Sequence, residues 1–178
     1  MKQLLQKYAE AVKEWDKTHR LVGKVSVEQL LKQSIAALTP MLSSHKGELL
    51  LDVGAGSGLM GVAWLALDAT NKTLFIEPKA KSHSFILSSL SSLPDLVGGR
   101  WSLLPKRIED VSRETVYSKG STRPFAVARA FSGNLSLKEA WDQSPLKDIP
   151  LYSFSTQLAD SGKATYLLEL IESLKETE

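Results

Sequence analysis

Residues 49–58 read Leu-Leu-Leu-Asp-Val-Gly-Ala-Gly-Ser-Gly, and this stretch decides the fold. The apolar run without turn residues predicts a buried parallel strand. The glycines of residues 54–58, called here the glycine turn, allow a tight turn and let a ligand approach bare backbone. Residues 59–67 have helical character, so the turn would lie at a helix N-terminus with free N–H groups. This order of strand, turn and helix opens a nucleotide-type binding site in an α/β sheet.

The glycine turn fits two cofactor templates. Gly56-x-Gly58-x-x-Gly61 matches the dinucleotide fingerprint, and the acid Glu77 follows at roughly the expected distance of ~20 residues. Asp52, however, stands before the glycines as Asp-x-Gly-x-Gly-x-Gly, which resembles the first motif of class I methyltransferases. Those proteins bind S-adenosylmethionine, and we favour this cofactor over a dinucleotide. A purely structural turn without a ligand is the remaining alternative.

Composition narrows the class of protein. A length of 178 residues predicts one domain, with residues 1–46 as an N-terminal helical cap and residues 47–178 as an α/β cofactor-binding core. The absence of cysteine excludes disulfides, thiol catalysis and Cys-ligated zinc, and it fits a cytoplasmic protein. No stretch approaches the ~18 apolar residues of a membrane span, and no secretory signal is visible. A net charge of +2 permits an RNA partner without requiring one.

Alternating strand and helix patterns follow the glycine turn. We expect a strand at 73–77, a helix at 79–93, a strand at 100–104, a short helix and loop at 110–124, and a strand at 125–129. Such alternation predicts a Rossmann-like α/β fold, a mostly parallel sheet with helices on both faces. Two amphipathic helices precede the turn, and Ser26 begins a capping box for the second. No His/Asp/Glu cluster has metal-ligand spacing, so we expect no metal site.

The last third of the chain is less regular. Its pattern predicts a helix at 135–141, a fifth strand at 151–155 and a closing helix at 164–174.

Four groups of residues stand in order between positions 4 and 131. They are Tyr8 with Trp15-Asp16-Lys17 and Leu21; Asp52-Val-Gly-Ala-Gly-Ser-Gly-Leu-Met-Gly61; Glu77-Pro-Lys-Ala-Lys81 with Phe85; and Arg107-Ile-Glu-Asp110 with Ala128-Arg129-Ala130. In this order and spacing they resemble the motifs of the bacterial small-subunit ribosomal RNA guanine-N7 methyltransferases, also called glucose-inhibited division protein B. The resemblance implies a class I methyltransferase fold, S-adenosyl-L-methionine as cofactor, and N7 of a guanine in small-subunit ribosomal RNA as target.

The resemblance also implies roles for single residues. The implied cofactor-binding residues are Asp52, Gly54, Ala55, Gly56, Ser57, Gly58, Glu77, Ile108, Glu109 and Arg129. Asp52 would meet the cationic amino group of the cofactor, and Glu77 would accept hydrogen bonds from its ribose hydroxyls. Ile108 and Glu109 would lie beside the adenine. Arg129 is the expected catalytic residue, placed at the methyl-transfer face against cofactor or RNA.

The implied partner is ribosomal RNA or the small ribosomal subunit, bound by a monomeric protein. Looped bases would be splayed out to reach the site. The basic residues expected around the site are Arg20, Lys24, Lys79, Lys81, Lys106, Arg123 and Arg129.

Several positions depart from the family pattern. Gln33, Ala36 and Ala37 replace polar and charged residues of the second helix, Ser82 replaces an Arg, and Met60 replaces a Pro. We also expect the closing pair of strands to be absent, because too few residues remain. A diverged, C-terminally shortened member that binds without turnover is therefore one alternative function. A dinucleotide-dependent oxidoreductase is a weaker one, since no hydride-transfer constellation is present.

Overall fold

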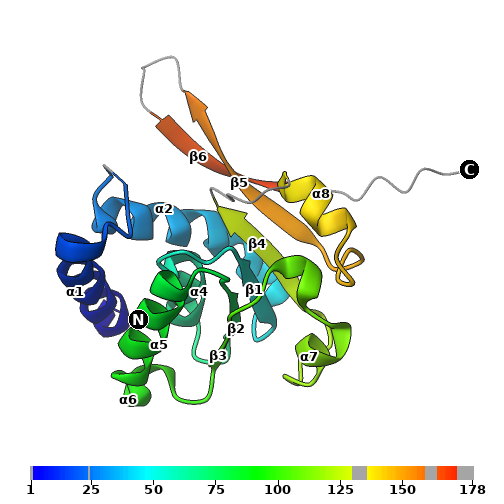
Figure 1. Cartoon of the computed structure of the whole chain (residues 1–178), viewed down its shortest axis with the longest axis horizontal. Helices are drawn as coiled ribbons and strands as arrows, with labels where there is room; N and C mark the ends of the chain where they lie inside the picture. Colours follow the sequence, from blue (N-terminus) through cyan, green and yellow to red (C-terminus); the bar gives the residue numbers. More distant parts are fainter. Residues whose placement is uncertain (1, 24, 130–135, 159–163, 172–178) are drawn as a thin grey trace, which may run out of the picture.

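A twisted sheet forms the centre of the molecule (Figure 1). The computed structural model describes residues 2–23, 25–129, 136–158 and 164–171, with side chains as far as Phe154. In this part of the chain the strand order is β3-β2-β1-β4-β5-β6, with β1 to β5 parallel and β6 antiparallel to β5. The strands are β1 (Leu49–Val53), β2 (Lys72–Ile76), β3 (Trp101–Leu104), β4 (Phe125–Arg129), β5 (Leu151–Leu158) and β6 (Ala164–Ile171).

Helices cover both faces of this sheet. One face carries α1, α2, α4 and α5, and the other carries η2, α7 and α8. The helical segments are α1 (Lys2–His19), α2 (Val27–Leu38), η1 (Thr39–Met41), α3 (Leu42–His45), α4 (Leu59–Leu67), α5 (Ala80–Ser91), α6 (Pro94–Val97), η2 (Ile108–Asp110), α7 (Arg113–Tyr117) and α8 (Leu137–Asp142). The predicted α/β class, a mostly parallel sheet flanked by helices, is confirmed. Among the described helices, none is long and apolar enough to cross a membrane.

Alternation along β1 decides what faces each helical layer. Leu49 and Leu51 pack in the core beside α8 and η2, whereas Leu50 packs against α2 and α4. Side chains two residues apart in a strand point to the same face. Asp52 therefore follows Leu50 and lies beneath the first turn of α4.

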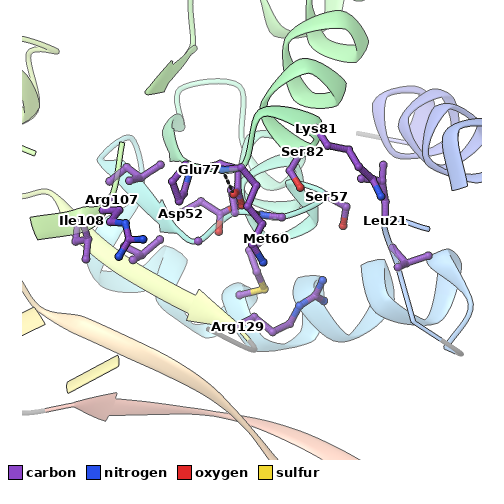
Figure 2. Close-up of a pocket in the computed structure, with 18 of the residues that line it drawn as sticks. Leu21, Asp52, Ser57, Met60, Glu77, Lys81, Ser82, Arg107, Ile108 and Arg129 are labelled. Carbon is purple, nitrogen blue, oxygen red and sulfur yellow. Dashed lines mark hydrogen bonds between the residues drawn. The ribbon is translucent and has the colours of Figure 1, made fainter. Parts of the chain in front are cut away.

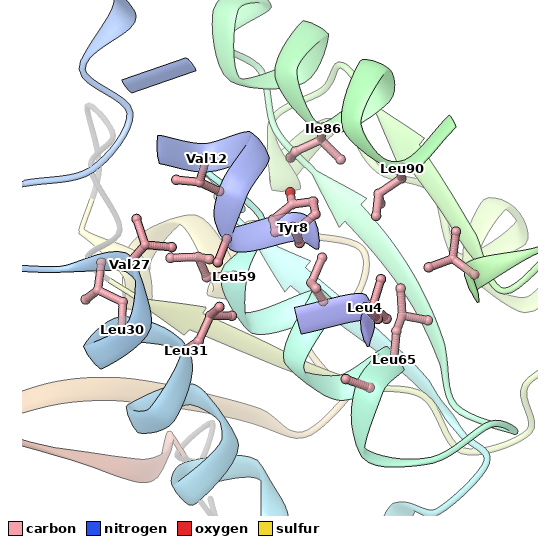
Figure 3. Close-up of a cluster of buried hydrophobic side chains, with 14 of the residues drawn as sticks. Leu4, Tyr8, Val12, Val27, Leu30, Leu31, Leu59, Leu65, Ile86 and Leu90 are labelled. Atoms are coloured by element: carbon pink, nitrogen blue, oxygen red, sulfur yellow. The ribbon is translucent and has the colours of Figure 1, made fainter. Parts of the chain in front are cut away.

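The N-terminal helix closes a second apolar core (Figure 3). Its inward side presents Leu4, Tyr8 and Val12 to α4 and α5, and all three are buried. Burying one such side chain stabilises the fold by about 1.5 to 3 kcal/mol. The described core members shown here include Val27, Leu30, Leu31, Leu59, Leu65, Ile86 and Leu90. The first two helices thus pack with the apolar sides that their pattern predicts against the helices α4 and α5.

Two predictions about the end of the chain are wrong. Residues 164–171 form strand β6 rather than a closing helix, and residues 172–174 lie outside the described part. The fifth strand is present as β5, and we expected no closing strands after it; one such strand, β6, is present and pairs antiparallel with β5 from Leu151↔Ile171 to Leu158↔Ala164. Leucine and glutamate favour helices, yet backbone pairing to a neighbouring strand overrides this weak preference. Figure 1 shows this hairpin extending beyond the helical layers.

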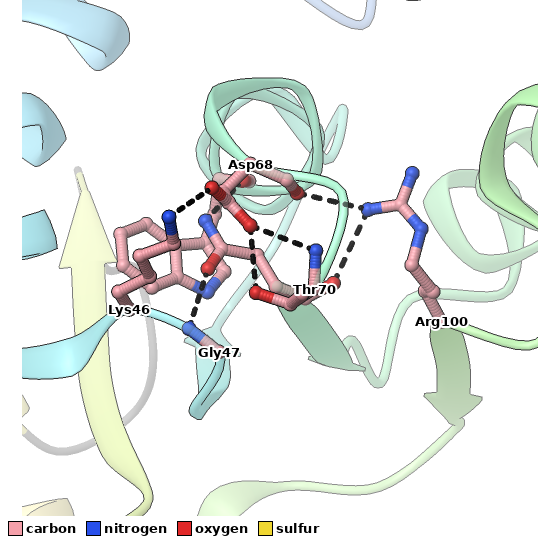
Figure 4. Close-up of polar contacts among 7 residues, drawn as sticks. Lys46, Gly47, Asp68, Thr70 and Arg100 are labelled. Atoms are coloured by element: carbon pink, nitrogen blue, oxygen red, sulfur yellow. Dashed lines mark hydrogen bonds and ion pairs between the residues drawn. The ribbon is translucent and has the colours of Figure 1, made fainter.

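Arg100 ties together the edge of the sheet far from the glycine turn (Figure 4). Its guanidinium donates to four backbone carbonyls: Leu65 (2.9 Å), Asp68 (3.3 Å), Asn71 (3.2 Å) and Leu96 (2.7 Å). These carbonyls belong to the C-terminal ends of α4 and α6 and to the turn before β2. A cation at helix C-termini also complements the helix dipole.

Candidate functional site

A cavity of about 920 Å³ opens at the carboxyl ends of the parallel strands (Figure 2). This edge, where the chain moves from β1 outward in both directions, is where α/β sheets bind ligands. The described residues that line it are Arg20, Leu21, Val22, Gly23, Val25, Leu30, Asp52, Val53, Gly54, Ala55, Gly56, Ser57, Met60, Ile76, Glu77, Pro78, Lys79, Lys81, Ser82, Lys106, Arg107, Ile108, Glu109 and Arg129. All predicted site residues except Gly58 are therefore brought together around one space.

Hydrogen bonds from the end of β2 hold the glycine turn. The N–H groups of Gly54 and Ala55 both donate to the Ile76 carbonyl, at 2.9 and 3.2 Å. The Gly56 N–H donates to Glu77 Oε2 at 2.7 Å. Gly54, Gly56 and Gly58 adopt φ values of 65, 56 and 69°, a left-handed backbone that costs glycine little. The turn therefore presents backbone without side chains to the cavity at Gly54 and Gly56.

Glu77 lies at the carboxyl end of β2 and is buried. One carboxylate oxygen accepts from Gly56 N–H and the other from Lys79 N–H, at 2.7 and 2.8 Å. A carboxylate oxygen has two lone pairs, so each still has capacity for a ligand donor. The acid is thus fixed in orientation before any ligand arrives.

Asp52 is the buried acid beneath the turn, with 2% of its surface exposed. Its Oδ2 accepts from the Gly61 N–H at 2.9 Å, in the first turn of α4. Burial raises the pKa of Asp52 to about 7; the Gly61 hydrogen bond and the charge of Arg129 oppose this rise, and Glu77 adds to it. Near neutral pH this carboxyl therefore favours a nearby cation, which would stabilise its ionised form.

Arg129 ends β4 on the opposite side of the cavity (Figure 2). Its Nη1 donates to Ser34 Oγ at 3.3 Å, so α2 helps to orient the guanidinium. Ser34 is fully buried, and its own hydroxyl donates to the Leu30 carbonyl. Arg129 is thereby placed between the two buried acids of the cavity and the α2 layer.

Ile108 and Glu109 begin η2, directly after β3 and the turn that follows it. Ile108 is 2% exposed and belongs to the core on the α8 face of the sheet. Both residues line the cavity, where they supply an apolar wall beside a polar edge.

Gly58 is the predicted cofactor residue that does not line the cavity. It caps α4, and a Cβ placed on it would lie 2.7 Å from Tyr8 Oη. Its position in the motif is therefore tied to packing against α1.

Sequence reasoning placed Arg20 of the loop between α1 and α2 beside the site, but it missed the apolar residues of that loop. Leu21, Val22 and Val25 of this loop line the cavity together with Met60 and Ser82, residues noted only as departures. Asp16 Oδ1 accepts from the N–H groups of Leu21 and Val22. The signal available was Asp16 within the Trp-Asp-Lys motif, one turn before the loop.

The basic residues expected around the site divide into three groups. Those that line the cavity are Arg20, Lys79, Lys81, Lys106 and Arg129. Arg123 does not line it; its backbone N–H donates to Glu48 Oε2. Lys24 lies outside the described residues.

Comparison with known proteins gives a family and relatives. A family model described as rRNA small subunit methyltransferase G matches residues 1–148. The Ribosomal RNA small subunit methyltransferase G of Helicobacter pylori (strain ATCC 700392 / 26695) is 34% identical over 113 residues, covering 62% of this chain and 60% of that protein. The protein of the same name from Aliarcobacter butzleri (strain RM4018) is 26% identical over 106 residues, covering 58% and 52%. The chain thus spans between 52% and 60% of the length of these relatives.

Solved structures share the fold at low sequence identity. A SAM-dependent methyltransferase from Aquifex aeolicus has a TM-score of 0.53 and 14% identity, covering 87% of this chain and 76% of that one. A SAM-dependent methyltransferase from Thiobacillus denitrificans, solved with S-adenosyl-L-homocysteine, has a TM-score of 0.53 and 18% identity, covering 82% and 56%. The predicted Rossmann-like methyltransferase fold is confirmed by this likeness.

Proposed function

Because this chain belongs to the rRNA small subunit methyltransferase G family, we propose that it transfers a methyl group from S-adenosyl-L-methionine to N7 of a guanine in small-subunit ribosomal RNA. One observation carries the proposal. The glycine turn, two buried acids and Arg129, which come from separate strands, surround a single cavity at the carboxyl ends of the sheet.

The residues of the cavity fit the proposed cofactor. Its volume of about 920 Å³ lies within the usual range for small-molecule sites, ~300 to 1,000 Å³. Asp52 would hold the cationic amino group, and Glu77 would accept from the ribose hydroxyls. Ile108 offers an apolar surface to the adenine, with Glu109 at its polar edge. Gly54 and Gly56 leave the backbone open to close approach.

The proposed reaction places few chemical demands on the chain. When bound, S-adenosyl-L-methionine supplies an electrophilic methyl group on a sulfonium. Guanine N7 already offers a lone pair, so no residue has to remove a proton from it. The work of the chain is to align the acceptor and to exclude water, which proximity effects reward strongly. Leu21, Val22 and Met60 line the cavity with apolar atoms suited to that exclusion.

Charge around the cavity supports an RNA acceptor. Arg20, Lys81 and Lys106 join Arg129 in lining it. Contacts from such residues to phosphates position a nucleic acid without reading its sequence. An RNA substrate also implies a cytoplasmic protein. We expect a monomer, and light scattering on the purified chain would contradict this by showing a dimer.

Two assays test the proposal in order. Calorimetry should show binding of S-adenosyl-L-methionine and none of NAD; binding of NAD alone, or of neither, would overturn the cofactor assignment. Radiolabelled methyl groups should then enter small ribosomal subunits from a strain that lacks the protein. Cofactor binding without incorporation would favour the alternative of a binding module without turnover, which Gln33, Ala36, Ala37 and Ser82 had suggested.

Arg129→Ala separates binding from transfer. We expect methyl incorporation to fall by about 100-fold, since the guanidinium faces the proposed acceptor, while cofactor affinity at pH 8.5 stays within about ten-fold. Arg123→Ala, outside the cavity wall, is the matched control and should retain full incorporation. Equal rates for the two variants would contradict the role given to Arg129.

A further inference from the structure

Tyr8 brings a polar atom of α1 to the glycine turn. Its side chain is fully buried in the apolar core under α1 (Figure 3). The ring meets Phe85 edge to face at 5.6 Å between centroids. At its far end the phenol Oη donates to the Ser57 carbonyl at 2.9 Å. Ser57 lines the cavity, so this bond joins the N-terminal helix to the cavity wall.

The phenol is held in its donor form. Burial raises the pKa of Tyr8 well above its usual value, and the negative charge of nearby Asp52 raises it further. Tyr8 therefore keeps its proton across the physiological range, and the Ser57 carbonyl always faces a donor.

The glycine turn is held from two sides. On one side Glu77 accepts from the Gly56 N–H, and on the other Tyr8 donates to the Ser57 carbonyl. Ser57 is 5% exposed, so loss of the phenol would leave a buried carbonyl without this donor. An unsatisfied buried acceptor is costly, and rotation of the Ser57–Gly58 peptide toward the cavity would relieve that cost. Such a rotation would change the position of the glycine-turn backbone that lines the cavity.

The absence of a side chain at Gly58 leaves space for the phenol of Tyr8. A Cβ at this position would lie 2.7 Å from Tyr8 Oη and 3.3 Å from side-chain atoms of Ile86 and Phe75. The close approach of Tyr8 thus requires the glycine, and the two residues form one contact.

We propose that Tyr8 is a positioning residue that sets the conformation of the glycine turn for the methyl donor, through its hydrogen bond to the Ser57 carbonyl. The inference rests on the proposed function for the identity of the ligand. Its structural part, the hold of Tyr8 on the turn, concerns the ligand-free chain as well.

The test compares Tyr8→Phe with Val12→Ala. Phenylalanine keeps the ring and removes the hydroxyl, whereas Val12→Ala removes buried apolar atoms from the same side of α1 and no hydrogen bond to the turn. Thermal unfolding measures stability, calorimetry measures the Kd for S-adenosyl-L-methionine, and amide hydrogen exchange of the ligand-free chain reports on Ala55 and Gly58. For Tyr8→Phe we expect a Kd about ten-fold higher and exchange at these amides about ten-fold faster. For Val12→Ala we expect a fall in unfolding temperature at least as large, with the Kd within about two-fold.

The possible outcomes test the role of Tyr8 and the proposed function separately. If the two variants change Kd and exchange alike, or if Tyr8→Phe changes neither, the role of Tyr8 is overturned while the proposed function stands. If the wild-type chain fails to bind S-adenosyl-L-methionine, the proposed function falls. Faster exchange in Tyr8→Phe alone would then still support the hold of Tyr8 on the turn, and unchanged exchange would overturn it.

Discussion

At the scale of single residues, Asp52 serves both the fold and the cavity. Its carboxylate accepts from the Gly61 N–H at the start of α4, where an anion complements the helix dipole. The same burial that fixes its geometry makes its charge costly, and its pKa accordingly rises to about 7. A residue chosen for stability alone would not carry this charge.

Asp52→Asn should therefore stabilise the chain while impairing the cavity. An acid whose folded pKa lies above its unfolded value binds its proton more tightly when folded. The free energy of unfolding of the wild type thus falls as pH rises from about 4 to about 7. Asparagine does not titrate, so the variant should be more stable by about 1 to 3 kcal/mol at pH 8 and nearly equal at pH 4.

Urea unfolding at both pH values measures this difference, with the exposed Asp95→Asn as control. Calorimetry at pH 8 should show cofactor binding weakened by more than ten-fold, because the uncharged amide of asparagine cannot form an ion pair with the cationic amino group. A destabilised variant at pH 8 would contradict the account of Asp52.

At the scale of elements, the approach of α4 to β2 depends on Gly61. A Cβ on this residue would lie 2.3 Å from Phe75 Cε1 and 2.6 Å from Thr73 Cγ2. Thr73 Oγ1 also donates to the Gly61 carbonyl at 3.1 Å, which locks the contact. Gly61, the third glycine of Gly56-x-Gly58-x-x-Gly61, therefore allows α4 and β2 to pack closely, as in other sheets with such turns.

Gly61→Ala should cost about 1 to 3 kcal/mol, because the added methyl group forces α4 away from β2. Gly23→Ala is a matched control, since a Cβ there meets no atom within 4 Å of the described structure. The midpoints of chemical unfolding compare the two. If Gly61→Ala proves as mild as Gly23→Ala, the helix is not held as closely as described.

Local pattern predicted the elements that build the cavity. The strand at Phe125–Arg129 has the predicted bounds, and β2 differs from its prediction by one residue at each end. Asp52 and Glu77 were placed at strand ends because acids there follow turn-free apolar runs. These features are encoded within a few residues, so pattern reveals them.

Features that depend on distant partners escaped prediction. Strand β6 forms by pairing with β5, and its leucines and glutamate by themselves favour a helix. The cavity wall at Leu21 and Val22 arises because α1 and α2 dock on α4 and carry their connecting loop to the sheet edge. The motif alone predicts Gly58 as a cofactor residue. Its contact with Tyr8 depends on the packing of α1, which the motif does not reveal.

At the scale of the whole molecule, the cavity and the Arg100 cluster lie at opposite ends of the parallel strands. This cluster is Arg100 with the carbonyls of Leu65, Asp68, Asn71 and Leu96. The cavity lies beyond the carboxyl ends of β1, β2 and β4, whereas Arg100 stands immediately before β3. Four carbonyls converge on its guanidinium there. The hydrogen bonds that stabilise this end of the fold are therefore separate from the residues that line the cavity.

Arg100→Ala tests this separation. Removal of a donor shared by four carbonyls should lower the free energy of unfolding by about 2 to 4 kcal/mol. The Kd for S-adenosyl-L-methionine, measured well below the unfolding temperature, should stay within about two-fold. Lys46→Ala removes an exposed ion pair with Asp68 in the same cluster, 3.0 Å long, and should cost less than about 1 kcal/mol. A large change in Kd for Arg100→Ala would show that the two ends are coupled.

The hydrogen bond from Tyr8 to Ser57 also has a consequence for the order of assembly. It joins residues 49 positions apart, and α1 packs on α4 and α5, which are both made later. Helix α1 is therefore synthesised before these partners, and its docking surface on α4 and α5 is complete only after synthesis has passed Ser91, the end of α5. Long-range contacts of this kind form late because the intervening chain has to be ordered first. Strands β1 and β2 can thus pair before the glycine turn receives its support from α1.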